Sequence, residues 1–156
     1  LARYCDAVGI HPSGYNNPPD ADWRTWSDAS APSHKGHPSE FFRGMVESYR
    51  NIMVKYGDGG KRLWATEFGW ASVENLGAPP VRGYEYAADN TEAEQAQFIV
   101  RAYQMGKGYG FMGVMFLWNL NFAPVSGKAD EKAAFGIVRP DWSPRQAFAA
   151  LANMPK

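Results

Sequence analysis

RLWATEF, the stretch from Arg62 to Phe68, decides the fold. It is apolar and aromatic except near its ends, and Glu67 lies at the carboxyl end, a pattern that indicates a buried strand. Side chains alternate between the two faces of a strand. We therefore expect Leu63 and Ala65 to lie on an inward face that leads up to Glu67. Trp64 and Phe68 would face surrounding helices.

Two more strand patterns flank this one. AVGI (7–10) is a short apolar run that ends at His11-Pro12, because proline cannot continue a central ladder. VMFLW (114–118) is almost continuously apolar, which predicts a strand that is covered on both faces. The stretches between the strands carry apolar residues at helical spacing, so strands and helices alternate along the chain.

Three helices are predicted from their start signals. Ser39 is a candidate N-cap for a helix over 39–56, and Thr91 with Glu94 has capping-box spacing for a helix over 91–105. Ser143-Pro144 predicts a short final helix that reaches about residue 154. The resulting β-α-β-α-β-α order predicts one α/β domain with a parallel sheet. In such folds the site lies at the carboxyl ends of the strands, where His11, Glu67 and Asn119 fall.

The composition excludes several classes of function. Sixteen basic residues balance sixteen acidic ones without a basic cluster, so no nucleic-acid partner is indicated. No apolar run approaches the roughly 18 residues that span a bilayer, so no membrane role is expected. His34 and His37 lack further ligands at metal-binding spacing, and neither a metal nor an organic cofactor is implied. Aromatic residues make up 15% of the chain, which fits either a large core or a carbohydrate site.

The surroundings of Glu67 indicate chemistry. WATEFGW (64–70) is apolar and aromatic around its one carboxylate. Burying a carboxylate in such a place costs several kcal/mol unless it is paired or hydrogen-bonded. A lone glutamate at a strand end is more often a surface or ion-paired residue. Here the apolar context favours a functional group.

Three motifs in this order resemble clan A retaining glycoside hydrolases, particularly (β/α)8 barrels related to families 5 and 39. WATEFGW (64–70) resembles their seventh-strand motif, which carries the glutamate nucleophile. VGIHPSGY (8–15) resembles the end of their sixth strand, and FLWN (116–119) resembles their eighth. FGIV (135–138) and SPRQA (143–147) are similar to the closing loop and the final helix. The resemblance implies that residues 1–156 form the C-terminal portion of a TIM (β/α)8 barrel, strands six to eight.

The resemblance also implies a role for each matching residue. Glu67 would attack the anomeric carbon of an oligo- or polysaccharide and form a glycosyl-enzyme intermediate. Trp118 would pack against the sugar bound at the cleavage point, and His11 would hydrogen-bond the nucleophile or a neighbouring hydroxyl group. Tyr15 and Trp70 would line the cleft.

One catalytic group of the family has no counterpart here. Its acid/base is a glutamate at the end of the fourth strand, usually in an Asn-Glu pair, and no such pair ends a strand in this sequence. Three βα units also cannot close an eight-stranded barrel, which takes roughly 250 residues. We therefore expect the first five units to lie outside this chain. The exposed sheet would then self-associate or pair with the missing half of the barrel.

Two alternatives remain open. The chain could be a carbohydrate-binding remnant without catalysis, or an unrelated α/β domain in which Glu67 only stabilises a loop. In the last case Glu67, His11 and Trp118 would not converge on one cleft. The N-terminus shows no recognisable targeting signal, so the compartment is unknown, although secretion fits a polysaccharide hydrolase.

Overall fold

The computed structural model describes residues 3–155 as a parallel sheet with helices packed alongside it. The described part of the chain has three strands, β1 (Ala7–Ile10), β2 (Arg62–Phe68) and β3 (Met112–Leu117). They lie in the order β1-β2-β3, and both pairings are parallel. The predicted alternation of parallel strands with helices is confirmed.

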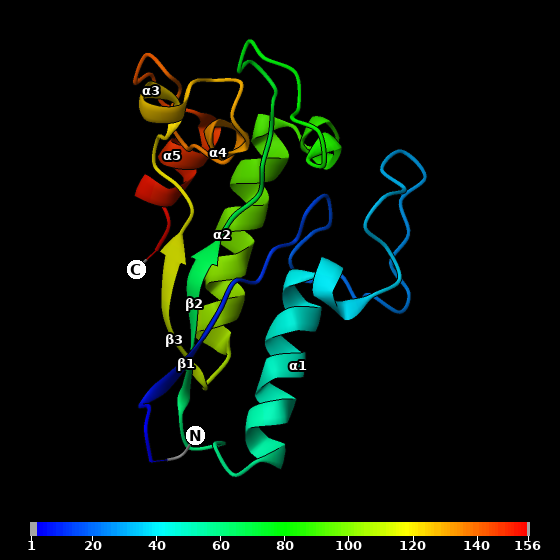
Figure 1. Cartoon of the computed structure of the whole chain (residues 1–156), viewed down its shortest axis with the longest axis vertical. Helices are drawn as coiled ribbons and strands as arrows, with labels where there is room; N and C mark the ends of the chain where they lie inside the picture. Colours follow the sequence, from blue (N-terminus) through cyan, green and yellow to red (C-terminus); the bar gives the residue numbers. More distant parts are fainter. Residues whose placement is uncertain (1–2, 156) are drawn as a thin grey trace.

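Two long helices connect the strands, and shorter ones follow β3. The helices are α1 (Phe42–Lys55), α2 (Glu92–Gly108), α3 (Ala123–Ser126), α4 (Glu131–Ala134) and α5 (Gln146–Ala152). Two 3-10 turns, η1 (Pro38–Glu40) and η2 (Glu85–Ala88), lie in the loops before α1 and α2. Figure 1 shows α3 and α4 beyond the carboxyl ends of the strands, on the side where a site was expected.

The predicted start of α2 is confirmed by its hydrogen bonds. The Thr91 hydroxyl accepts from the backbone N–H of Glu94 at 3.1 Å, and the Glu94 carboxylate accepts from the backbone N–H of Thr91 at 2.8 Å. The helix continues through Gly106, where we expected it to stop. A Cβ atom at Gly106 would overlap the Met115 sulfur, so glycine here allows close packing against β3.

The other two predicted N-caps are wrong. Ser39 lies inside η1, where the His37 imidazole accepts from its backbone N–H at 3.3 Å, and α1 begins only at Phe42. The Ser143 hydroxyl donates to Asp141 at 2.7 Å instead of capping α5. In both places a serine makes a local turn with a neighbouring side chain, which competes with capping.

The buried face of the sheet is not the one that the pattern predicted. Leu63 and Ala65 are fully buried and belong to the core formed with α1 and α2, whose buried members include Phe42, Val46 and Ile99. Trp64, expected against the helices, lies on the opposite, open face with its ring 6.4 Å from that of Phe116. Nor is β3 covered on both faces, because Phe116 and Val114 are exposed. Apolar character alone does not say which face meets the helices.

Register shifts interrupt the alternation of β2 before Glu67. Ala65 pairs with Met115 and Phe68 pairs with Leu117, so β2 has one residue more than β3 between these two pairs. Ala65 and Phe68 therefore both enter the core, although they are three residues apart. An extra residue of this kind re-aims the side chains beside it. Glu67 therefore does not follow Leu63 and Ala65 onto the buried face of the strand.

Trp70 lies in the core and not in a cleft. Its side chain is fully buried, and its indole N–H donates to the Asn17 carbonyl oxygen at 2.9 Å. The rings of Phe42 and Phe98 lie within 6 Å of it. A Cβ atom at Gly14 would overlap the indole, so the loop after β1 packs directly on this ring. The prediction that Trp70 contacts substrate is therefore wrong, since its surface and its N–H are both used internally.

Trp70→Phe should destabilise the chain by about 1–3 kcal/mol, because the Asn17 carbonyl loses its donor and the ring volume falls. Urea unfolding followed by circular dichroism measures the change. The matched control is Trp142→Phe, since Trp142 is 61% exposed and should change stability by less than about 0.5 kcal/mol. Equal effects of the two substitutions would contradict the core assignment of Trp70.

The open face of the sheet should cause this chain to self-associate when it is produced alone. Trp64, Val114 and Phe116 form an exposed apolar patch there, and apolar patches of this kind favour association. Size-exclusion chromatography with light scattering should give a mass above 17.3 kDa. Trp64→Gln with Phe116→Gln should shift the mass toward the monomer, whereas Ile52→Gln, on the exposed side of α1, should not. A monomer at all concentrations for the unsubstituted chain would refute the expectation.

Candidate active site

Glu67 and His11 meet at the carboxyl edge of the sheet, where β1 and β2 end side by side. Glu67 is the penultimate residue of β2, and His11 directly follows β1. The His11 Nδ1 atom lies 3.5 Å from Glu67 Oε2, and the two side chains are 63% and 44% exposed. Ion pairs with this much exposure contribute little stability. Both groups therefore remain available to a ligand.

The Glu67 carboxylate is less buried than its apolar sequence context suggested. We expected a carboxylate enclosed by aromatic residues, at a desolvation cost of several kcal/mol. Instead, the side chain is nearly half exposed. Its flanking residues Phe68 and Trp70 turn into the core, and the carboxylate turns outward into a pocket.

A pocket of about 650 Å³ opens beside this pair. This volume is within the range of small-molecule sites. His11, Glu67 and Trp118 all line it, so the structure brings the three predicted residues to one cleft. Their convergence argues against an unrelated α/β domain in which Glu67 only stabilises a loop.

Trp118 is held at the pocket by close contact between the loops after β2 and β3. Its backbone N–H donates to the Phe68 carbonyl oxygen at 2.8 Å. A Cβ atom at Gly69 would overlap the carbonyl oxygen of Trp118, so only glycine permits this approach. The Trp118 ring contacts Phe122 at a centroid distance of 4.9 Å. Its apolar surface lies in the same pocket as the carboxylate.

Tyr15 lines the pocket and belongs to an aromatic cluster that the sequence did not reveal. Its ring stacks on His34 at 4.5 Å and meets Tyr86 edge-on at 5.1 Å. Tyr15 adopts φ 53°, a backbone conformation that costs a non-glycine residue energy. The Asn90 amide donates to the carbonyl oxygen of Tyr15 at 2.8 Å and holds it there.

The described residues contain no group of three or more His, Cys, Asp or Glu side chains arranged to hold a metal ion. His34 packs against tyrosines, and His37 contacts the Ser39 hydroxyl at 2.7 Å. Within residues 3–155, no helix is both long and apolar enough to cross a membrane.

Apart from glycines, five further pocket residues come from the segments that follow β2 and β3, and sequence reasoning missed them. They are Tyr84, Tyr86, Glu131, Lys132 and Phe135. These loops lack the periodicity that identifies strands and helices, so no pattern indicated which of their residues face the pocket.

Two of these residues, Tyr86 and Lys132, have a pKa that their surroundings raise. Burial raises the pKa of Tyr86 well above its ordinary value, which keeps its phenol neutral. Lys132 contacts the Glu131 carboxylate at 3.0 Å and that of Asp130 at 3.2 Å. Hydrogen bonds to these two carboxylates, Glu131 first, raise the pKa of Lys132. The pocket therefore combines carboxylates, a paired ammonium group and several aromatic surfaces.

An aromatic surface and hydrogen-bonding groups together suit a carbohydrate. A sugar ring has apolar C–H faces that pack on aromatic rings, and hydroxyl groups that need polar partners. Here Trp118 and Tyr84 offer the first kind of contact, and Glu67 and His11 offer the second.

No family model matches this sequence, and no curated protein matches it significantly. Solved structures do resemble it in fold. A family 39 glycoside hydrolase from Bacteroides cellulosilyticus WH2 matches 96% of this chain with a TM-score of 0.57 and 19% identity. A family 2 β-galacturonidase from Eisenbergiella tayi matches 97% with a TM-score of 0.57 and 15% identity. A β-glucuronidase from Bifidobacterium dentium matches 98% with a TM-score of 0.54 and 18% identity.

The match covers only part of each of these proteins, 27%, 24% and 21% of their chains in the same order. At such identities the likeness shows the fold alone. The chain thus has the fold of a portion of a glycosidase (β/α)8 barrel, with three parallel strands and the helices that follow them.

Proposed function

We propose that this chain supplies part of the active site of a retaining glycoside hydrolase that acts on an oligo- or polysaccharide, with Glu67 as the nucleophile. The observation that carries the proposal is the position of the Glu67 carboxylate. It lies at the carboxyl edge of a parallel sheet, 3.5 Å from the His11 imidazole, in a pocket that Trp118 also lines. Catalytic groups of barrel enzymes come from the ends of strands at this edge.

In the proposed reaction the Glu67 carboxylate attacks the anomeric carbon of a bound sugar. A bond forms from a carboxylate oxygen to that carbon, and the glycosidic C–O bond breaks with its electron pair leaving on the departing oxygen. Water then attacks the same carbon, gives its proton to the conjugate base of the acid that protonated the leaving group, and releases the sugar and the free carboxylate. Trp118 packs against the ring, while His11 hydrogen-bonds the nucleophile or a sugar hydroxyl group.

Departure of an ordinary sugar alcohol also requires an acid, roughly 5 Å from the nucleophile in retaining enzymes. Glu131 is a second carboxylate among the described pocket residues. Its Oε1 atom forms an ion pair with Lys132 Nζ at 3.0 Å. Glu131 is therefore poorly placed to donate a proton. We propose that the acid/base residue is contributed from outside this chain, in agreement with the small share of each glycosidase that the chain matches.

The pairing of Glu131 with Lys132 also favours a second candidate function, carbohydrate binding without hydrolysis. The aromatic surfaces of Trp118, Tyr84 and Phe135 would serve binding as well as catalysis. The two candidates differ in whether Glu67 reacts covalently, so an experiment that detects a bond to Glu67 separates them.

Activated 2-deoxy-2-fluoro glycosides with a dinitrophenolate leaving group should label Glu67. Their leaving group departs without protonation, so the chain needs no acid of its own, and the fluorine slows hydrolysis of the intermediate. Because the structural neighbours include uronidases, the probes should include neutral and uronate sugars. We expect one dinitrophenolate released per labelled chain, and peptide mass spectrometry should place the sugar on Glu67. Glu67→Gln should abolish the label.

The matched control is Glu47→Gln, which changes a glutamate on the outer surface of α1 that is paired with Arg43. It should be labelled at the rate of the unsubstituted chain. Sugar binding detected by isotope-labelled NMR at the Trp118 indole, without any label on Glu67, would favour the binding-only function. Neither binding nor labelling would reject both candidates.

A further inference from the structure

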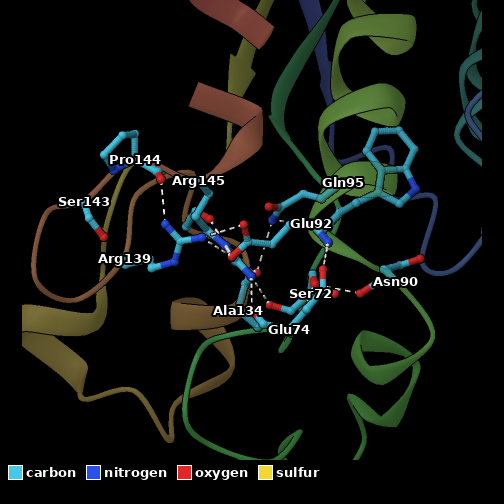
Figure 2. A network of polar contacts seen from close by, with 12 residues as sticks. Ser72, Glu74, Asn90, Glu92, Gln95, Ala134, Arg139, Ser143, Pro144 and Arg145 are labelled. Atoms are coloured by element: carbon cyan, nitrogen blue, oxygen red, sulfur yellow. Dashed lines mark hydrogen bonds and ion pairs between the residues drawn. The ribbon is translucent and has the colours of Figure 1, made fainter. Parts of the chain in front are cut away.

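Arg145, the residue before α5, is almost completely buried and has an acceptor for every N–H group of its guanidinium. Its Nε donates to the Glu92 carboxylate at 3.0 Å. The remaining donors reach backbone carbonyl oxygens, those of Ser72 and Glu74 at 2.9 Å each, Ala134 at 3.3 Å and Gly136 at 3.2 Å. Figure 2 shows the guanidinium at the centre of this network. A buried arginine is tolerated when its donors are satisfied in this way.

The four carbonyl groups belong to the two loops that form the walls of the pocket. Ser72 and Glu74 lie in the loop after β2, which leads to Tyr84. Ala134 is the last residue of α4, in the segment after β3, and Ala134 and Gly136 are the immediate neighbours of Phe135, which lines the pocket. Arg145 therefore fixes the main chain on both sides of a pocket ring.

The Glu92 carboxylate holds the arginine in place. Its side chain is 2% exposed and lies in the first turn of α2, where the helix dipole favours a negative charge. Its Oε1 atom accepts from Arg145 at 3.0 Å and from Arg139 at 2.8 Å, and its Oε2 atom accepts from Arg139 at 2.7 Å. Burial lowers the pKa of Arg145, but a guanidinium stays protonated near neutral pH. The network is therefore a buried ion cluster that is anchored to a long helix.

Further hydrogen bonds join the same two loops. The Ser72 backbone N–H donates to the Ala134 carbonyl oxygen at 2.9 Å. The Gln95 amide on α2 donates to the carbonyl oxygens of Trp70 at 2.8 Å and Ala134 at 3.3 Å. Glu67, by contrast, belongs to the ladder of β2 and has no hydrogen bond to this cluster among the described contacts.

We propose that Arg145 is a positioning residue, which sets the spacing between the two pocket loops and thereby the placement of Phe135 and Tyr84 against a bound sugar. The sugar part of this inference rests on the proposed function, but the loop spacing does not. Because Glu67 is held by the sheet, loss of the arginine should weaken sugar binding and leave the reactivity of the carboxylate unchanged.

Arg145→Lys tests the proposal, because an ammonium keeps the charge but cannot direct donors to two loops at once. Hydrogen exchange should accelerate about tenfold or more at residues 69–91 and 118–139, with β1 and β2 as internal references. Labelling kinetics with the fluoroglycoside should show an inhibition constant raised about tenfold, with the maximal labelling rate within about twofold. If the substitution only unfolded part of the protein, a smaller fraction of the chains would be labelled, and the inhibition constant of the folded fraction would not change.

Two variants keep the test decisive. Arg139→Gln removes the more exposed of the two guanidinium groups that hold the Glu92 carboxylate and leaves the buried Arg145–Glu92 pair intact. It should therefore fold where Arg145→Lys fails, and it should shift the same loop peptides by a smaller factor. Arg43→Lys, at a surface ion pair with Glu47, should change neither measurement. Unchanged loop exchange in both cluster variants, or a fall in the maximal labelling rate alone, would overturn the proposal. If the unsubstituted chain takes no label, the proposed function fails, and loop exchange alone decides the role of Arg145.

Discussion

The parallel pairing of β2 with both of its neighbours is the constraint on which the rest of the structure depends. It brings residues that are more than 50 positions apart in the sequence to one edge of the sheet, because parallel strands end on the same side. His11 follows β1, Glu67 ends β2 and Trp118 follows β3, so each reaches the pocket from a different strand. The core under β2 keeps this edge in place, with Leu63, Ala65 and Phe68 packed against α1 and α2.

Strong local patterns in the sequence predicted the strands and the start of α2 correctly. The resemblance to a known family added the three residues that meet at the pocket. What failed was the orientation of side chains around β2. The choice of face placed Trp64 against the helices and was wrong, whereas Phe68 does pack against them as expected. The register shifts near Ala65 and Phe68 could not be read from the residues themselves. Pairing register depends on a partner strand about 50 residues away.

The aromatic residues explain why composition left the function open. Trp70 and Trp118 follow neighbouring strands at similar positions, yet one is a core residue and the other lines the pocket. The main chain around them accounts for this difference in environment. The loop at Gly14 packs directly on the Trp70 ring, whereas Gly69 lets the chain approach the Trp118 carbonyl oxygen. The role of Arg145 could not be predicted from the sequence either, because there it is one residue near the start of a predicted helix. Only the folded loops show that its five donors all find acceptors.

The tight approach at Gly69 has a consequence for how such a site can diversify. The loops after β2 and β3 touch there through main-chain atoms, and Arg145 likewise recognises carbonyl groups and no particular side chain of either loop. Residues such as Tyr84 and Phe135 could therefore be replaced without removing the main-chain contacts that join the loops. Moving this pocket to another scaffold would require both loops together with Arg145, because neither loop alone carries the hydrogen bonds that join it to the other.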